Sequence, residues 1–193
     1  MLKKPDFHFP QIFRKLKRGP AIIQPKDAGM FIAYTGLNKD SVVAELGTGS
    51  GFMTIYLAQI AKHVTTYEMR DEFFQIAKSN VQKVGLDNVD CKLRNVLEQW
   101  IDEKELDLIF CDIKEPEVAI EKMHASLKEG GYVAAHCLNI EQAKAFHLAC
   151  ETKKFKEVFT LENIIREYAV RDFGIRPAHM GLLHTAYLVF ARK

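Results

Sequence analysis

The sequence lacks the motifs that mark several common classes of protein. Its four cysteines form no C-x-x-C pair, and it contains neither H-E-x-x-H nor a cluster of cysteines and histidines, so nothing in it predicts a bound metal. No Gly-Lys-Ser/Thr motif is present, which excludes a P-loop. No apolar run approaches the roughly 18 residues that cross a bilayer, and the N-terminus lacks the apolar region of a secretory signal. We therefore expect a cytoplasmic protein without a membrane partner or a metal.

An excess of one charge is also missing, because the formal net charge is only +2. Basic residues are nevertheless crowded near the N-terminus, where four could meet the phosphates of a nucleic acid or form a solvated helix face: Arg14, Lys15, Lys17 and Arg18. The apolar spacing predicts a short amphipathic helix over 8–18. Its apolar side would pack on the body of the protein or on another subunit, or lie on a membrane surface.

The remainder of the chain alternates strand-like runs with helical patterns. After a helix at 26–35, we expect strands at 42–46, 63–68, 90–95, 106–112 and 132–137, and helices at 51–60, 71–84, 116–127 and 140–153. This alternation predicts an α/β fold with a mostly parallel sheet covered on both faces. The last runs lack intervening helices and predict an antiparallel C-terminal strand pair that closes the sheet: 157–161, 163–171 and 185–192.

The clearest functional signal is a glycine-rich turn after the first of these strands. We identify five of its residues as candidates for binding a cofactor: Gly47, Thr48, Gly49, Ser50 and Gly51. Glycine lets the backbone turn sharply and approach a ligand where a Cβ would clash. The G-x-G-x-G spacing departs from the dinucleotide fingerprint G-x-G-x-x-G, because position 52 is Phe, and it resembles the turn of S-adenosylmethionine (SAM) methyltransferases more closely. A structural βα turn without a ligand is the alternative.

Further candidates lie at the carboxyl ends of the strands, where open α/β sheets bind their ligands. Glu68 and Met69 end the second strand, and the Glu68 carboxylate is suited to hold the ribose hydroxyls of an adenosine-type cofactor. Asn95 and Val96 end the third strand, where they would border the adenine ring. Asp112 follows four apolar residues of the fourth strand, a position where an unpaired carboxylate is costly. It either serves a ligand or caps the helix that follows.

Several separate segments carry a resemblance to one family. They are 22–29 (IIQPKDAG), 45–51 (ELGTGSG), 67–70 (YEMR), 112–116 (DIKEP), 176–179 (RPAH) and 184–191 (HTAYLVFA). The glycine loop alone fits many methyltransferases, whereas the P-K-D-A, R-P-x-H and H-T-x-x-L-V-F-A segments are more particular. Together, from about residue 22 to residue 192, they resemble the tRNA (adenine-N1)-methyltransferases that modify the T-loop adenine.

This resemblance implies a Rossmann-like methyltransferase fold, SAM as the cofactor, and methyl transfer to N1 of a T-loop adenine in tRNA. Asp112 matches the family aspartate, which implies that it contacts the cofactor and stabilises the reacting adenine as the catalytic residue. Arg176 and His179 lie in a family-like segment and are implied to contact RNA or a neighbouring subunit, although His179 could equally be a packed histidine. The family assembles as tetramers, or as heteromers with a noncatalytic paralogue, so the resemblance also implies an oligomer, most simply a homotetramer.

The sequence departs from the family pattern in two places. Family members usually carry a small β-rich domain before the P-K-D-A segment, and here only some 20 residues precede it. We therefore expect a basic arm over 1–20 and a catalytic domain over 21–193. The family motif D-x-P-x-P has Lys114 in place of its first proline, so we expect the loop after Asp112 to be more mobile or differently oriented.

Two other readings stay open. One is a SAM-dependent methyltransferase of a small molecule, such as a corrin precursor, which is favoured by the short N-terminus. The other is a noncatalytic subunit that presents tRNA to a partner, which the glycine loop, Glu68 and Asp112 argue against. Measurable SAM binding would separate a methyltransferase from a binding subunit, and a salt-dependent affinity for tRNA would separate an RNA enzyme from a small-molecule enzyme.

Overall fold

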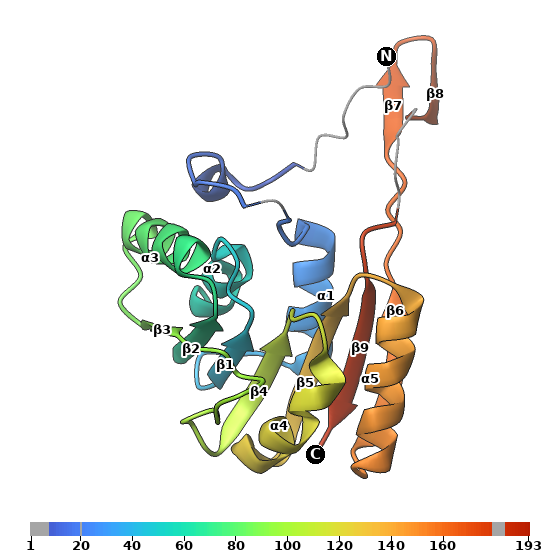
Figure 1. Cartoon of the computed structure of the whole chain (residues 1–193). Helices are drawn as coiled ribbons and strands as arrows, with labels where there is room; N and C mark the ends of the chain where they lie inside the picture. Colours follow the sequence, from blue (N-terminus) through green and yellow to red (C-terminus); the bar gives the residue numbers. More distant parts are fainter. Residues whose placement is uncertain (1–7, 20, 179–183) are drawn as a thin grey trace.

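Seven strands form one sheet in the order β3-β2-β1-β4-β5-β9-β6 in the computed structural model, which describes residues 8–19, 21–178 and 184–193 (Figure 1). Five strands are parallel: β1 (Val42–Leu46), β2 (His63–Glu68), β3 (Val89–Leu93), β4 (Leu106–Cys111) and β5 (Leu127–Cys137). The chain runs outward from β1 through β2 to β3, and then returns to place β4 on the other side of β1. The switch point therefore lies between β1 and β4, and the carboxyl ends of these two strands are where the fold leaves room for a ligand.

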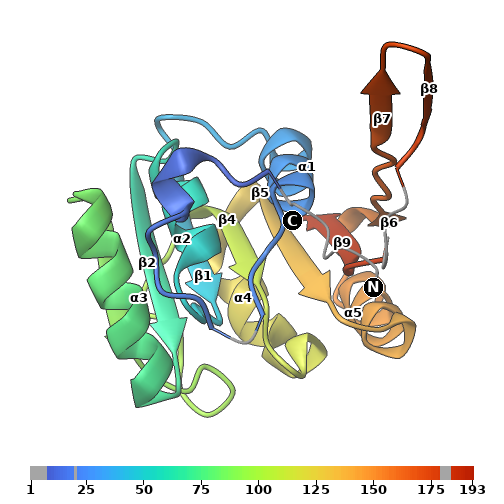
Figure 2. The ribbon, with the colours of Figure 1, turned by 90° about the horizontal axis from the view of Figure 1, so that it is seen from above.

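Helices cover both faces of the sheet (Figure 2). One face packs against α1 (Pro25–Thr35), α2 (Phe52–Ala58) and α3 (Asp71–Val84), and the other packs against η2 (Pro116–Ala119), α4 (Ile120–Ser126) and α5 (Ile140–Thr152). The predicted helix over 116–127 is thus a 3-10 turn followed by a short α-helix. Among the described residues, none of the helices is long and apolar enough to span a membrane.

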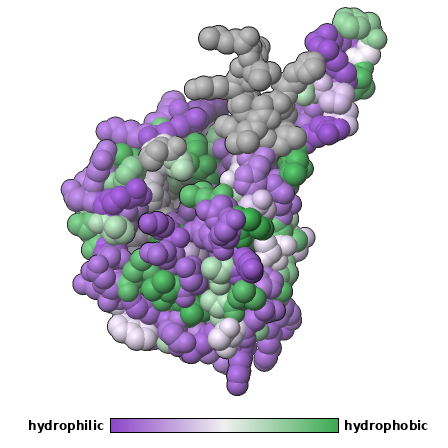
Figure 3. Space-filling model, turned by 45° about the vertical axis from the view of Figure 1, so that its right-hand side comes forward, coloured by the Kyte–Doolittle hydropathy of each residue, from purple (hydrophilic) through white to green (hydrophobic). Residues whose placement is uncertain are grey.

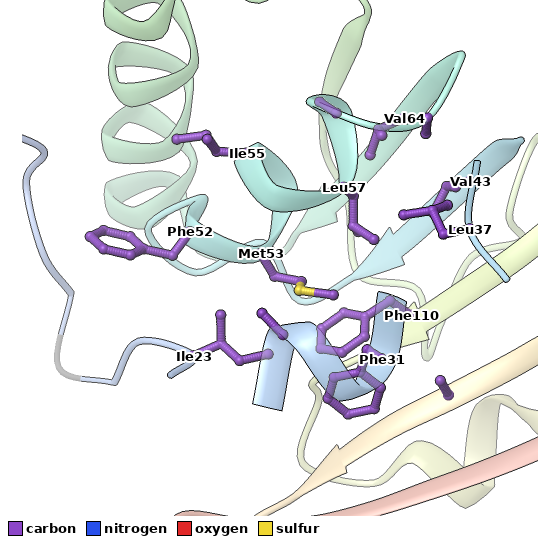
Figure 4. Packing of buried hydrophobic residues seen from close by; sticks show 14 of the residues in the cluster. Ile23, Phe31, Leu37, Val43, Phe52, Met53, Ile55, Leu57, Val64 and Phe110 are labelled. Atoms are coloured by element: carbon purple, nitrogen blue, oxygen red, sulfur yellow. The ribbon is translucent and has the colours of Figure 1, made fainter. Parts of the chain in front are cut away.

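The strands divide their side chains between two hydrophobic cores. On β1, Val43 joins the core beneath α1 and α2, whereas Ala44 and Leu46 join the core beneath α4 and α5. In the first core, the Phe31 ring of α1 meets the Phe110 ring of β4 edge-on, with 4.8 Å between the ring centroids (Figure 4). Burial on both faces explains why the central strands β1 and β4 read as largely apolar runs.

The C-terminal strands close the sheet with an antiparallel pair, as expected. Strand β9 (Tyr187–Arg192) runs between β5 and β6 (Lys156–Glu162), antiparallel to both. The run 163–171, which was expected to contribute to this closing pair, does not join the sheet. Its last residues form β7 (Tyr168–Arg171), which pairs with β8 (Gly174–Pro177) in a separate hairpin that projects from the body (Figures 1 and 3).

The N-terminal arm is not the helix predicted over 8–18. Only η1 (Gln11–Phe13) is helical, and beyond it the backbone bonds to another part of the chain. The Lys17 N–H donates to Asn80 Oδ1 at 3.0 Å, and Asn80 Nδ2 donates to the Lys17 carbonyl at 2.8 Å. The expected packing of the apolar side on the body is confirmed. Phe13 is fully buried, and its ring centroid lies 4.3 Å from that of Tyr56 on α2. A contact with α3, 63 residues away, therefore replaces the helix that local spacing predicted.

Candidate active site

A cavity of about 560 Å³ opens at the carboxyl ends of the parallel strands. This volume lies within the range of small-molecule and cofactor sites. Eight of the predicted cofactor-binding residues line it: Gly47, Gly49, Ser50, Glu68, Met69, Asn95, Val96 and Asp112. The edge-of-sheet argument therefore brings these residues together, and their contacts with a cofactor stay predictions.

Gly47 is the position where the loop admits no other residue. Its φ is +92°, and a Cβ built on it would lie 2.2 Å from the carbonyl oxygen of Asp112. Its N–H donates to the Tyr67 carbonyl at 2.9 Å, which ties the start of the loop to the end of β2. This glycine therefore lets the Asp112 loop pass directly beside the glycine loop.

Gly49 has φ +54°, and the space where its Cβ would lie is open. Of the five predicted loop residues, Thr48 and Gly51 do not line the cavity. Thr48 turns inward, with its hydroxyl 2.5 Å from the hydroxyl of Thr66 on β2. Gly51 has φ +81°, and a Cβ on it would approach Ala77 of α3 to 3.3 Å, so this glycine allows α2 and α3 to pack closely.

Glu45 is a fully buried carboxylate beneath the loop. Thr54 donates to its Oε2 at 2.5 Å and Thr66 donates to the same oxygen at 2.7 Å, while Oε1 has no hydrogen-bond partner among the described residues. Burial raises the pKa of Glu45 to about 8, the hydrogen bonds from the two threonines oppose this rise, and the nearby charges of Asp112 and Glu68 add to it. A buried carboxyl group with a raised pKa therefore lies two residues before the glycine loop begins at Gly47.

Glu68 is held by a ring of donors. Its Oε2 accepts from the Gly49 N–H at 2.9 Å, and its Oε1 accepts from the backbone N–H groups of Met69 and Arg70 at 3.1 and 3.0 Å and from Arg70 Nε at 3.1 Å. A carboxylate oxygen accepts two hydrogen bonds readily, so Oε2 keeps one acceptor position toward the cavity. These four hydrogen bonds fix the orientation of the Glu68 carboxylate in the absence of a ligand.

The loop after β3 forms the next part of the wall. Asn95 Oδ1 accepts from the Leu97 N–H at 3.0 Å, and the carbonyls of Val96 and Leu97 both accept from Lys122 Nζ of α4, at 2.8 and 2.6 Å. Backbone carbonyls that bind a lysine do not move freely. Asn95 and Val96 therefore face the cavity from a fixed loop.

Asp112 directly follows β4, which lies on the other side of β1 from the strand that ends at Glu68. Its N–H donates to the Leu46 carbonyl at 2.8 Å, which extends the β1–β4 ladder to the rim, and its side chain is 38% exposed. It does not cap the following helix, because η2 begins at Pro116 with Glu115 at the N-cap position. The reading of Asp112 as a helix cap is therefore wrong, and the carboxylate lines the cavity instead.

A third wall comes from the β5–α5 connection, which the sequence reasoning missed. Leu138, Asn139 and Gln142 line the cavity there. Gln142 Nε2 donates to the carbonyls of Ile113 and Lys114 at 2.8 and 2.9 Å, so it holds the loop that follows Asp112. The sequence could have indicated these residues. They directly follow the predicted strand 132–137, and ligands of open α/β sheets bind at the carboxyl ends of the strands.

Other lining residues had weaker signals in the sequence. Phe73 reaches the cavity from α3, and the Arg70 guanidinium stacks 4.1 Å from the centroid of its ring. Arg94 lines the cavity as the first residue after β3, and Lys114 as the residue in place of the family proline. Within the described ranges, no group of three or more metal-ligating side chains comes together.

The predicted RNA-binding residues divide between two places. The side chains of Arg14, Lys15, Lys17 and Arg18 are all exposed on the arm. This arm adjoins the cavity wall, because Asn80, which binds the Lys17 backbone, also donates to the carbonyl of Ser50 at 2.8 Å. Arg176 is exposed on β8, away from the cavity, and His179 lies outside the described residues.

Comparison with known proteins places the chain in a family. A model described as the tRNA methyltransferase complex GCD14 subunit matches residues 14–185. The tRNA (adenine(57)-N(1)/adenine(58)-N(1))-methyltransferase TrmI of Methanocaldococcus jannaschii is 31% identical over 94% of this chain and 74% of its own length.

Two crystal structures are similar over most of the chain. The tRNA (m1A58) methyltransferase TrmI of Aquifex aeolicus superposes with a TM-score of 0.87 at 33% identity, covering 94% of this chain and 74% of its own. A SAM-dependent O-methyltransferase of Thermotoga maritima superposes with a TM-score of 0.88 at 30% identity, covering 95% and 71%. The Rossmann-like methyltransferase fold and the resemblance drawn from the sequence are both confirmed: the chain belongs to the family of the GCD14 and TrmI tRNA methyltransferases.

Proposed function

We propose that this chain transfers the methyl group of SAM to N1 of a T-loop adenine in tRNA, in the cytoplasm. One observation carries the proposal: Glu68 and Asp112 face one cavity at the switch point of the sheet, in a chain that is 31% identical to an archaeal tRNA adenine-N1 methyltransferase. A binding-only subunit has no use for a complete cofactor cradle beside a carboxylate at the rim.

The residues of the cavity fit SAM. The open space at Gly49 leaves the backbone free to approach a ligand, and Glu68 Oε2 retains an acceptor position for a ribose hydroxyl. Asn95 and Val96 lie on the next loop, where an adenine ring attached to that ribose would be bordered. The cofactor supplies an electrophilic methyl group on a sulfonium ion, so the protein has mainly to orient the two reactants and shape the charge around them.

Asp112 shapes the charge around the reacting base. Adenine N1 is a neutral nucleophile, and methylation leaves the ring cationic. A carboxylate at the edge of the base accepts a hydrogen bond from the exocyclic amine and stabilises the positive charge that develops. Its position in the lining of the same cavity as Glu68 and its partial exposure support this role.

The target adenine must leave its stack to enter the cavity, and basic residues must bind the tRNA phosphates while it does so. Arg14, Lys15, Lys17 and Arg18 are exposed on an arm that adjoins the cavity, and we assign them to phosphates near the flipped adenine. Arg176 on β8 would contact RNA or a neighbouring subunit further away. The arm over 1–20 and the catalytic domain over 21–193 remain the proposed division of the chain.

The proposal includes a homo-oligomer, with a tetramer as its form. The β7–β8 hairpin supports it, because Val170, Phe173 and Ile175 are 74%, 85% and 68% exposed. A two-stranded hairpin is marginal alone, and a second copy would cover its apolar side chains. Light scattering of the purified protein tests this part, and a monomer at working concentration contradicts it.

The test of the reaction is incubation with SAM and an unmodified tRNA transcript, followed by nuclease digestion and mass spectrometry of the nucleosides. We expect 1-methyladenosine from the parent and a loss of rate by orders of magnitude in Asp112→Asn, which keeps the shape but not the charge. Glu115→Gln, on the same loop, is the matched control. SAM binding without any methylated nucleoside would contradict the proposal in favour of a small-molecule methyltransferase or a subunit that needs a partner.

A further inference from the structure

A buried imidazole lies behind the Asp112 carboxylate. His136 is on β5, one residue beyond Ala135, which pairs with Cys111 on β4. His136 and Asp112 therefore stand side by side at the ends of neighbouring strands. Nδ1 of His136 lies 3.5 Å from Oδ1 of Asp112.

Apolar residues neighbour His136 on two sides. The residue is 9% exposed, it pairs with Leu188 across the β5–β9 ladder, and its ring centroid is 6.4 Å from that of Phe31. Its Nδ1 is buried and makes no hydrogen bond to any described residue. A buried polar atom without a partner is costly, so the nearby carboxylate is the group that this nitrogen is placed to meet.

The contact also determines where the proton of the ring lies. A bare Nδ1 lone pair pointing at a carboxylate oxygen would be repelled by it, whereas an Nδ1–H is attracted. The tautomer with the proton on Nδ1 is therefore the one that this geometry favours. A separation of 3.5 Å is long for such a bond, and catalytic hydrogen bonds in ligand-free structures often shorten when substrate binds.

We propose that His136 is a positioning residue for Asp112: its Nδ1–H donates to Oδ1 and leaves Oδ2 free to accept from the exocyclic amine of the target adenine. This inference rests on the proposed function. Asp112 benefits from such a partner, because a carboxylate that is 38% exposed can otherwise adopt several orientations in solvent. A hydrogen bond to one oxygen fixes the rotamer of Asp112 before the adenine binds, so no ordering of this side chain is needed during the reaction.

The test compares two substitutions at His136. His136→Ala removes the donor, and we expect kcat to fall about 10- to 100-fold, while the KM for tRNA and the Kd for SAM change less than about twofold. His136→Asn places an amide N–H close to the position of Nδ1 and should restore most of kcat. His147→Asn is the matched control, because His147 is a partly buried histidine on α5 whose Nδ1 lies 2.9 Å from Thr160 Oγ1, and we expect it to leave kcat unchanged.

A measurement on the unaltered protein keeps the proposal testable if a variant fails to fold. Nitrogen-15 NMR of the histidine rings reports which nitrogen carries the proton, and we expect Nδ1–H for His136. An Nε2–H tautomer would overturn the proposal, as would a folded His136→Ala variant with kcat within twofold of the parent, or a folded His136→Asn variant as slow as His136→Ala. If the parent forms no 1-methyladenosine, the proposed function is wrong, and the NMR result still decides whether Nδ1 of His136 carries the proton that a bond to Asp112 requires.

Discussion

Replacing Glu45 by Gln should change how the free energy of unfolding depends on pH. The pKa of Glu45 is raised from 4.5 to about 8, chiefly because burial removes the hydration of its charge. Between these values the folded chain keeps a proton that the unfolded chain has lost, so stability falls as pH rises through this window. At about 1.4 kcal/mol for each pH unit, Glu45 should lower the free energy of unfolding by about 3 kcal/mol between pH 5 and pH 8.

Urea unfolding followed by circular dichroism, at several pH values from 5 to 8, measures this contribution as the difference between the parent and Glu45→Gln. Gln keeps an oxygen that can accept from Thr54 and Thr66 but carries no charge, so the variant should gain stability relative to the parent toward pH 8. Glu129→Gln is the control, because the Glu129 side chain is 83% exposed, and its effect should stay within about 0.5 kcal/mol at every pH. A difference between Glu45→Gln and the parent that does not vary with pH would refute the reasoning.

Three further predictions follow from the cavity walls. Glu68→Ala removes the acceptor for the ribose hydroxyls and should weaken SAM binding about 10- to 100-fold in calorimetry, and an unchanged Kd would contradict that role. Gly47→Ala forces a Cβ onto the Asp112 carbonyl at positive φ and should cost about 2 kcal/mol or more of unfolding free energy, whereas Gly49→Ala, which meets open space, should cost less. Gln142→Ala frees the carbonyls of Ile113 and Lys114 and should lower kcat and destabilise the fold by about 1 to 2 kcal/mol, while Gln142→Glu, which keeps only acceptors, should not restore kcat.

The parts of the site that the sequence predicted are those encoded locally. Gly47 directly follows an apolar run and Glu68 ends a short run rich in β-branched residues, so each strand and the residue at its end can be read within a few positions. Parallel strands then bring these ends to one edge, which is why residues 21 positions apart in the chain line one cavity. Asp112 follows the same logic from β4.

The parts that failed depend on partners far away in the chain. The arm reads as a helix because Phe13 and its apolar neighbours have helical spacing, but Asn80 takes the hydrogen bonds that a helix would have used. Nothing near position 17 signals that contact. The run 163–171 has strand composition, but its residues pair with β8 rather than with the sheet, and composition does not specify a pairing partner.

Two of the segments that carried the resemblance most specifically, P-K-D-A and H-T-x-x-L-V-F-A, meet in one partly buried cluster that is separate from Asp112. Lys26 Nζ donates to Asp27 Oδ1 at 2.7 Å, to Thr185 Oγ1 at 2.6 Å and to the Asn163 carbonyl at 2.5 Å, and the Thr185 hydroxyl donates to Asp27 Oδ2 at 2.6 Å. A buried charge pair of this kind is stable only when its remaining donors and acceptors are satisfied, so Lys and Asp at these positions require Thr185 and Asn163 as well.

Asn163 directly follows β6 and Thr185 precedes β9, so the cluster ties both ends of the stretch that contains the β7–β8 hairpin to the start of α1. None of its four side chains is among the described residues that line the cavity. The P-K-D-A and H-T segments therefore hold the ends of the stretch that carries the hairpin, whereas the proposed chemistry depends on Glu68 and Asp112. A variant that disrupts the cluster, such as Asp27→Asn, should therefore change the oligomeric state in light scattering and leave the Kd for SAM in calorimetry unchanged.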